Sequence, residues 1–279
     1  MSGGHLRWEG DATALSSVAH GEQALGTVTY LRRERFLMPD GSVDDIPVVS
    51  GNAWRGLLRR TAGDLWWDAA GQPPLTLAVA HAIWSGGALA KSSGTPLTGP
   101  RLMRVRAVCP PVGLFGAAGG GRILDGCVQV GKLLPVCRET AHVLPARYAE
   151  GGPLPSVWDL TQVENYSRMP LQPRAGGPAC DPADGMPPAR FGMETFIAGT
   201  RFHTWLTCGW ASADEVAFLL EVLALYGMNP RVGGMARSGH GELRLALTLT
   251  RGQTPQPAAD WRATVAAEPD LHAVLAGLD

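Results

Sequence analysis

Residues 201–228, RFHTWLTCGWASADEVAFLLEVLALYGM, hold the two clearest secondary-structure signals of the chain. From Phe202 to Cys208, apolar and polar residues alternate with the period of two that predicts a half-buried strand. Ser212 and Glu215 then form an S-x-x-E capping box, a pattern that begins many helices. The apolar residues after it recur at helical spacing, and Gly227 is placed to end the helix. A strand followed directly by an amphipathic helix is thus expected here.

The next segment, RVGGMARSGHGEL (231–243), has four glycines in thirteen positions and leads into another strand. In ELRLALTLT (242–250), a leucine at every second position predicts one packed face and one free face. The glycines allow the main chain to approach a phosphate closely and offer N–H donors, and Arg237 adds a positive charge. The alternative is a tight connection between a helix and an edge strand.

Composition describes a folded chain of 279 residues, 45% hydrophobic, with a net charge of −1. The longest apolar segment, VAFLLEVLALYGM, is interrupted by Glu221 and is too short to span a membrane. No basic-then-apolar leader opens MSGGHLRWEGD, so we expect a cytoplasmic protein. The cysteines form no C-x-x-C pair, which predicts reduced thiols and neither a metal site nor a cofactor. They are Cys109, Cys127, Cys137, Cys180 and Cys208.

Charge is segregated along the chain. Residues 101–138 contain six basic residues and the single acid Asp125. The last seventy residues, in contrast, are acidic. This asymmetry favours one basic working face for a polyanion such as nucleic acid, and a solvated basic face without a ligand is the alternative.

The first half of the chain predicts a strand and a helix. GTVTYLRRERFLMP (26–39) is β-rich and ends at the turn signal PDG. GNAWRGLLRRTAGDLWWDAA (51–70) has apolar residues at helical spacing, with Ser50 or Asn52 as the N-cap. Three arginines, Arg55, Arg59 and Arg60, are expected off the apolar stripe, near a helix N-terminus that favours anions.

Two segments interrupt this regular pattern. Residues 72–125 predict an inserted helical and loop region, and 145–195 are rich in proline and glycine. A loop of that length is either functional or a surface excursion. The order of elements predicts a single α+β domain over 1–279, with an RRM/ferredoxin-like palm and a C-terminal tail at 251–279.

Several of these segments resemble the RAMP superfamily of CRISPR proteins. IPVVSGNAWRGLLRR is similar to the I-P-x-S-x-x-G-x-x-R signature, and VGGMARSGHGELRL to the C-terminal glycine-rich loop. LFGAAGGGRILDG resembles the L-F-G segment of the crRNA-binding backbone subunit, and ENYSRMP with RFGMETFIAGTRF the two sides of its thumb. The match covers roughly residues 10–250 in order, and HGEQALGTVTYLRRE and VVSGNAWRGLLRR are most similar to the type IV version.

The resemblance implies a subunit that binds guide crRNA in copies lined up along it, with a palm that grips the backbone and an extended β-hairpin thumb at 145–195 that separates bases. It also implies a target nucleic acid, other effector subunits and a helicase as candidate partners, and no membrane. The residues expected to contact RNA are His20, Arg32, Arg33, Ser50, Asn52, Arg55, Arg59, Arg122, Asn165, Arg168, Met169, Arg190, Phe191, Met193, Gly233, Gly234, Arg237 and Gly239.

We expect no catalysis. The resemblance places the target-cleaving aspartate of type III relatives near Thr29, and no acid stands between Glu22 and Glu34. A hydroxyl cannot replace a carboxylate as metal ligand or base at neutral pH. The alternatives are a metal-independent endoribonuclease that processes crRNA, with His20 or His240 as general base, and a nucleic-acid-binding module outside CRISPR systems.

Overall fold

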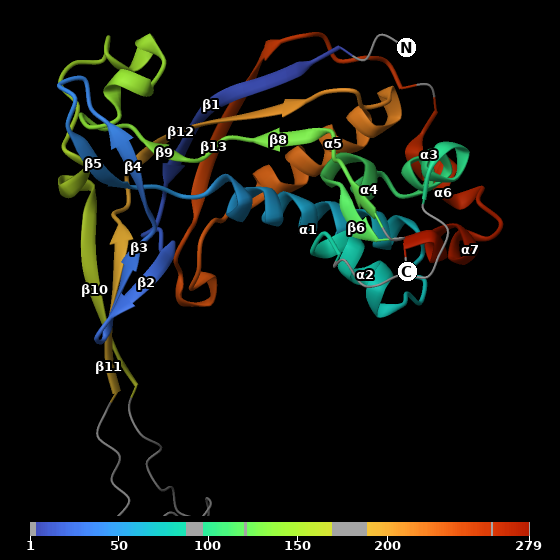
Figure 1. The fold of residues 1–279 in the computed structure, drawn as a ribbon, viewed down its shortest axis with the longest axis horizontal. Helices are drawn as coiled ribbons and strands as arrows, with labels where there is room; N and C mark the ends of the chain where they lie inside the picture. The colour runs from blue at the N-terminus through green and yellow to red at the C-terminus, as the bar shows by residue number, and fades with distance from the viewer. Residues whose placement is uncertain (1–3, 88–96, 120–121, 169–188, 258, 279) are drawn as a thin grey trace, which may run out of the picture.

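The computed structural model describes residues 4–87, 97–119, 122–168, 189–257 and 259–278 (Figure 1). Its largest sheet, the palm sheet, has the strand order β13 (Leu243–Arg251), β1 (Leu6–Ala14), β12 (Arg201–Cys208), β8 (Val128–Val130). All pairs are antiparallel, and β9 (Leu134–Pro135) also pairs with β12.

Helices α1 (Gly51–Ala69) and α5 (Ala213–Met228) pack against each other below this sheet (Figure 1). The order β1–α1–β8–β12–α5–β13 is β-α-β-β-α-β, which is compatible with the expected α+β palm.

The capping box of α5 is confirmed, and the alternation in β12 is confirmed except at His203, which is buried although it was expected on the polar face. Phe202 and Leu206 are fully buried while Trp205 is only half-buried. The Ser212 side chain accepts from Glu215 N, and the Glu215 carboxylate accepts from Ser212 N. The helix ends at Met228, with Asn229 as its C-cap, instead of at the expected Gly227.

The second sheet, the thumb sheet, has the order β10 (Thr161–Arg168), β11 (Ala189–Phe196), β3 (Val28–Leu31), β2 (Gly21–Leu25). β10 and β11 are antiparallel, and β11 runs parallel to β3. The strand expected at 26–39 is therefore divided, since β3 joins this sheet and β4 (Arg33–Leu37) pairs with β5 (Val43–Pro47). Between β4 and β5, Asp40 accepts from the amide and hydroxyl of Ser42, which gives PDG its turn role.

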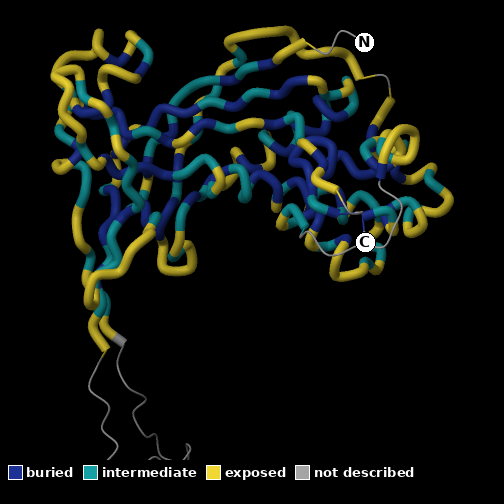
Figure 2. Tube along the Cα trace, viewed as in Figure 1, coloured by how far each residue is buried: buried dark blue, intermediate teal, exposed yellow. Residues whose placement is uncertain are grey.

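A helical lobe lies at the opposite end of the molecule from β4 and β5 (Figure 1). It contains α2 (Leu77–Trp84), α3 (Gly99–Val108), α4 (Pro110–Phe115), β6 (Ala117–Gly119), β7 (Arg122–Leu124), α6 (Trp261–Ala266), α7 (Leu271–Leu275) and the 3-10 turn η6 (Ala276–Leu278). The segment expected as a C-terminal tail is thus packed, and Trp261 meets Phe218 edge to face at 4.7 Å. One continuous core joins the palm sheet to the lobe (Figure 2).

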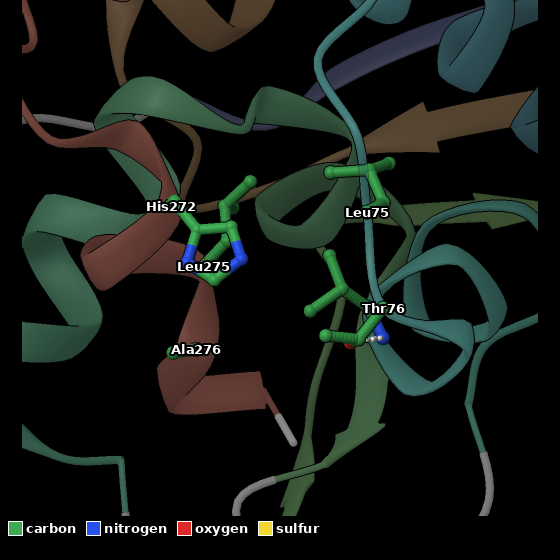
Figure 3. A pocket seen from close by; sticks show the side chains of 6 residues that line it. Leu75, Thr76, His272, Leu275 and Ala276 are labelled. Carbon is green, nitrogen blue, oxygen red and sulfur yellow. Dashed lines mark hydrogen bonds between the residues drawn. The ribbon is translucent and has the colours of Figure 1, made fainter.

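Short 3-10 turns complete the described structure: η1 (Ala141–Val143), η2 (Ala146–Tyr148), η3 (Val157–Leu160) and η5 (Ala236–Ser238). A small, mostly apolar pocket lies between Leu75, two residues before α2, and His272 and Leu275 of α7 (Figure 3). It offers little polar chemistry. No helix in the described ranges is long and apolar enough to cross a membrane.

Candidate nucleic-acid interface

Three segments of the predicted site meet at one place in the structure. Gly234 N, in the glycine-rich loop, donates to the carbonyl of Ala19 at 2.7 Å. The next residue, His20, accepts through Nε2 from the amide of Ser50 at 3.2 Å, and its carbonyl accepts from Arg32 N at 2.8 Å. The loop, the segment before β2 and the start of α1 are therefore contiguous.

Ser50, one of the two predicted caps, begins α1. Its side chain accepts from Ala53 N at 3.2 Å, while Asn52 lies inside the helix and is exposed. The remaining free N–H groups of the first turn carry partial positive charge. Burial, with the nearby Arg32 charge, lowers the pKa of His20 below its ordinary value. The imidazole is thus neutral at pH 7.

The glycine-rich loop needs its glycines to pack on the chain itself. Gly233 has φ +81°, and a Cβ there would lie 2.1 Å from the carbonyl oxygen of Ala19. Gly241 has the same φ, and its Cβ would lie 2.1 Å from Val232 O. Gly239 has φ +87° and ends η5. No L residue with a side chain fits the first two positions.

The expectation of free amides in this loop is wrong at three glycines. The amides of Gly234, Gly239 and Gly241 donate to Ala19, Ala236 and Ser17 respectively. The partner segment 17–19 lies more than two hundred residues earlier in the sequence, so the loop sequence alone does not reveal it. The exposed side chain of Arg237 is the loop's available cation.

The prediction that Arg55 and Arg59 lie on the outer face of α1 is wrong for Arg59 and only partly right for Arg55. Arg59 is 6% exposed, and its Nη2 donates to the carbonyl of Phe115. Arg55 is half-buried and donates to the same oxygen at 2.7 Å. Both guanidiniums point to the end of α4, where backbone carbonyls lack helical partners. Arg60 is exposed, as expected.

Arg32 and Arg33 are ion-paired within the chain. Arg32 lies 2.8 Å from Glu22 and 3.8 Å from Glu34, and Arg33 lies 2.6 Å from the buried Glu194. Each positive charge is therefore neutralised locally.

The thumb strands carry the remaining predicted residues. Asn165 and Arg190 are exposed, and the Phe191 ring stacks on Tyr166 with centroids 5.4 Å apart. Met193 lies beside Gly21, and β10 ends at Arg168, whose backbone pairs with Ala189. Met169 lies outside the described residues.

A polar contact that the sequence does not reveal ties the thumb to the glycine-rich loop. Tyr166 Oη and His240 Nε2 are 2.5 Å apart, and Tyr166 also donates to Glu164 at 2.9 Å. His240 is 4% exposed, so it cannot reach a ligand in this arrangement.

The cations available for phosphate are those without an ion pair or hydrogen bond in the described ranges. They are Arg35, Arg60, Arg101, Arg122, Arg190, Arg237, Arg244 and Arg251. Arg122 lies on β7, which pairs with β6 in the helical lobe. Arg60 and Arg35 were not among the residues predicted to contact RNA. A cation must be exposed and unpaired to bind phosphate, and the pattern of charges along the sequence does not show which arginines are exposed.

No cluster of three or more metal-ligating side chains occurs among the described residues. The described cysteines are all free thiols, and burial raises the pKa of Cys137 to about 11.

No protein-family model matches this sequence, and no curated protein matches it. Among solved structures, the chain is similar to a chain of one described as "Type IV-B CRISPR Complex", with a TM-score of 0.66 and 29% identity. The match covers 94% of this chain and 100% of that chain. The fold and this similarity support the placement of this chain in the class of CRISPR effector subunits. Within that class, the expected resemblance to a type IV subunit is confirmed.

Proposed function

We propose that this chain is a non-catalytic backbone subunit of a CRISPR ribonucleoprotein that binds guide crRNA in successive copies and supports its pairing with a target. The observation that carries the proposal is the meeting of the glycine-rich loop, residues 17–20 and the α1 N-terminus on the side of the palm where the thumb strands lie (Figure 1). A RAMP-type backbone subunit would use these same segments. The likeness to a type IV-B CRISPR complex chain supports it independently.

The chemistry of this surface suits a sugar-phosphate backbone. Arg237 lies in the loop itself, Arg190 lies on thumb strand β11 and Arg60 lies farther along, in the middle of α1. All three are exposed and make no ion pair or hydrogen bond with the described residues. The exposed Asn52 and the α1 N-terminus add hydrogen-bond donors beside Ser50. Since the whole chain has a net charge of −1, binding depends on these few cations.

The histidines give little support to the alternative, an endoribonuclease that processes crRNA. A general base needs a ring nitrogen that reaches the substrate. Nε2 of His20 already accepts from Ser50 N, and His240 is buried. Thr29, at the position of the type III aspartate, pairs with Ala24 and Met193 within the thumb sheet.

Co-expression with a CRISPR array tests the proposal. The purified protein is expected to carry RNA, and electron micrographs are expected to show copies at regular intervals along it. Protein that carries no RNA and does not bind single-stranded RNA at low salt would contradict binding. Incubation with repeat RNA tests the alternative, since site-specific cutting lost in His20→Ala would replace our assignment.

A further inference from the structure

Trp158 is a large aromatic side chain that is exposed and yet firmly held. It is 48% exposed and lies in η3, which directly precedes thumb strand β10. Ser156 caps η3 by accepting from Trp158 N, and the next residue, Val157, is fully buried. Glu139 accepts from Ser156 Oγ at 2.7 Å and from Val157 N at 2.8 Å. Thr161 Oγ1 donates to the Trp158 carbonyl at 3.5 Å, so the backbone that carries the indole is held on both sides.

A guanidinium lies between this indole and a second ring. Arg33 Cζ is 5.7 Å from the Trp158 centroid and 5.8 Å from the Tyr30 centroid. Glu194 anchors it at 2.6 Å, and the other oxygen of that carboxylate accepts from Leu31 N at 2.8 Å. Because Arg33 is neutralised by a buried acid, its effect is to position the ring and not to bind phosphate.

A free cation continues the same surface. Arg35 lies two residues after Arg33 on β4, hence on the same side of the strand, about 7 Å along it. It is exposed, and it makes no ion pair or hydrogen bond within the described chain. A fixed aromatic ring and an unpaired cation along the same strand are the two kinds of group with which proteins bind single-stranded nucleic acid.

We infer that Trp158 is a stacking platform for an unpaired nucleobase of RNA, with Arg35 on the neighbouring phosphate. This inference rests on the proposed function and names a contact at the base of the thumb that is separate from the glycine-rich loop. A protein partner is the competing occupant. The combination of aromatic rings and guanidinium groups favours RNA, because a base can stack on a ring while its phosphate binds a guanidinium.

The test compares short single-stranded RNAs, with and without bases, on Trp158→Ala, Trp158→Leu and Trp158→Phe. Stacking predicts a loss of affinity of about 5- to 150-fold for the alanine and leucine variants and a smaller loss for phenylalanine. The salt dependence stays unchanged, and the loss disappears on abasic RNA. Trp210→Ala is the matched control, since Trp210 is 74% exposed but lies beside His5, after the far end of β12.

Three results would overturn the inference. Unchanged affinity of folded Trp158→Ala removes the platform and leaves the proposed function intact. An equal loss on abasic RNA, or a loss only in the number of copies per RNA, assigns Trp158 to a structural or protein contact. Wild-type protein that binds no RNA removes both proposals. Thermal unfolding of each variant identifies those that fail to fold, and Trp158→Phe preserves the ring if alanine does not fold.

Discussion

The guanidinium of Arg59 on α1 donates to the carbonyl of Phe115 at the end of α4. Among the described residues no carboxylate forms an ion pair with it, and Arg55 shares the same acceptor. Burial, together with the Arg55 charge, lowers the pKa of Arg59 to about 10, so it remains protonated at pH 7. This contact joins the palm helix to the helical lobe.

Arg59→Ala is expected to lower the free energy of unfolding by about 1.5–3 kcal/mol, the range for a hydrogen bond to a charged group. The exposed neighbour Arg60 provides the matched control. Arg60→Ala is expected to leave stability unchanged and to weaken RNA binding. Denaturant titrations and RNA-binding isotherms of both variants check this pair. A stable Arg59→Ala protein with weaker, less salt-dependent binding would place Arg59 on RNA instead.

Arg237→Ala and Arg190→Ala are expected to weaken binding equally for RNAs of different sequence. Each lost phosphate contact lowers the slope of log K against log salt by about 0.7 for a single strand. Fluorescence anisotropy over a series of salt concentrations measures it. Arg262→Ala, which removes a cation paired with Glu221 at 2.6 Å in the helical lobe, is the control. Equal slopes for all three variants would exclude the loop and thumb arginines as phosphate ligands.

Gly233→Val is expected to destabilise the loop because its Cβ would meet the Ala19 carbonyl and because φ is +81°. Strain of this kind costs about 1–3 kcal/mol. Gly234→Ala is a mild control, since its Cβ would lie 3.9 Å from the same oxygen. Hydrogen exchange at the amides of residues 232–241 compares the two. Similar protection in both variants would show that the loop does not depend on this close approach.

His203 makes stability depend on pH. Its ring faces Tyr148 Oη at 3.3 Å and Glu9 at 3.8 Å, with Asp11, Arg147 and Arg7 nearby. Burial, aided by the two arginines and opposed by the two acids, lowers the pKa of His203 below 6.5. Between the lowered pKa of the folded state and the ordinary pKa of 6.5 in the unfolded state, the unfolded chain binds more protons than the folded one. The stabilisation is therefore complete above about pH 6.5 and falls as the pH drops below it.

His203→Gln is expected to reduce this pH dependence by up to about 1.4 kcal/mol per pH unit. Unfolding free energies between pH 7.5 and 5 measure the difference from wild type. His142→Gln, which changes an exposed histidine, should retain the wild-type slope. Since burial also lowers the pKa of His20, some pH dependence is expected to persist in His203→Gln.

Local patterns predicted the elements well. The Ser212 capping box, the alternation in β12 and the Ser50 cap depend on residues within a few positions of one another. All three are confirmed, apart from the buried His203 in β12. The type IV resemblance is also confirmed, because it depended on several motifs in order.

Partners distant in sequence were not predictable. Arg59 looked exposed because its acceptor, the Phe115 carbonyl, lies 56 residues later in the chain. Arg33 looked free because Glu194 is 161 residues away. The sequence shows which residues carry a charge. Only the fold shows which of those charges already have a partner within the chain.

Tyr166→Phe tests whether the thumb is held to the palm through His240. The Tyr166 hydroxyl is the hydrogen-bond partner of His240 Nε2, and His240 Nδ1 is already buried without one in the described structure. The variant removes the hydrogen bond to Nε2, whose remaining neighbour is Glu164 at 3.7 Å, and leaves Nδ1 unpaired, which costs about 1–3 kcal/mol. Since Phe191 still stacks on the remaining ring, the hairpin itself should stay formed.

The expected result is faster hydrogen exchange in residues 161–166 and 236–241 together, with little change in the palm sheet. Tyr148→Phe is the matched control. Tyr148 lies in η2 and donates to Asp11 of β1, so its hydroxyl takes no part in the contact between the thumb and the glycine-rich loop. RNA binding by Tyr166→Phe should fall more than its stability does, because a loosened thumb must be ordered again when RNA binds. Unchanged exchange in both segments would mean that the pairing of β11 with β3 and with Val18 is enough to position the thumb.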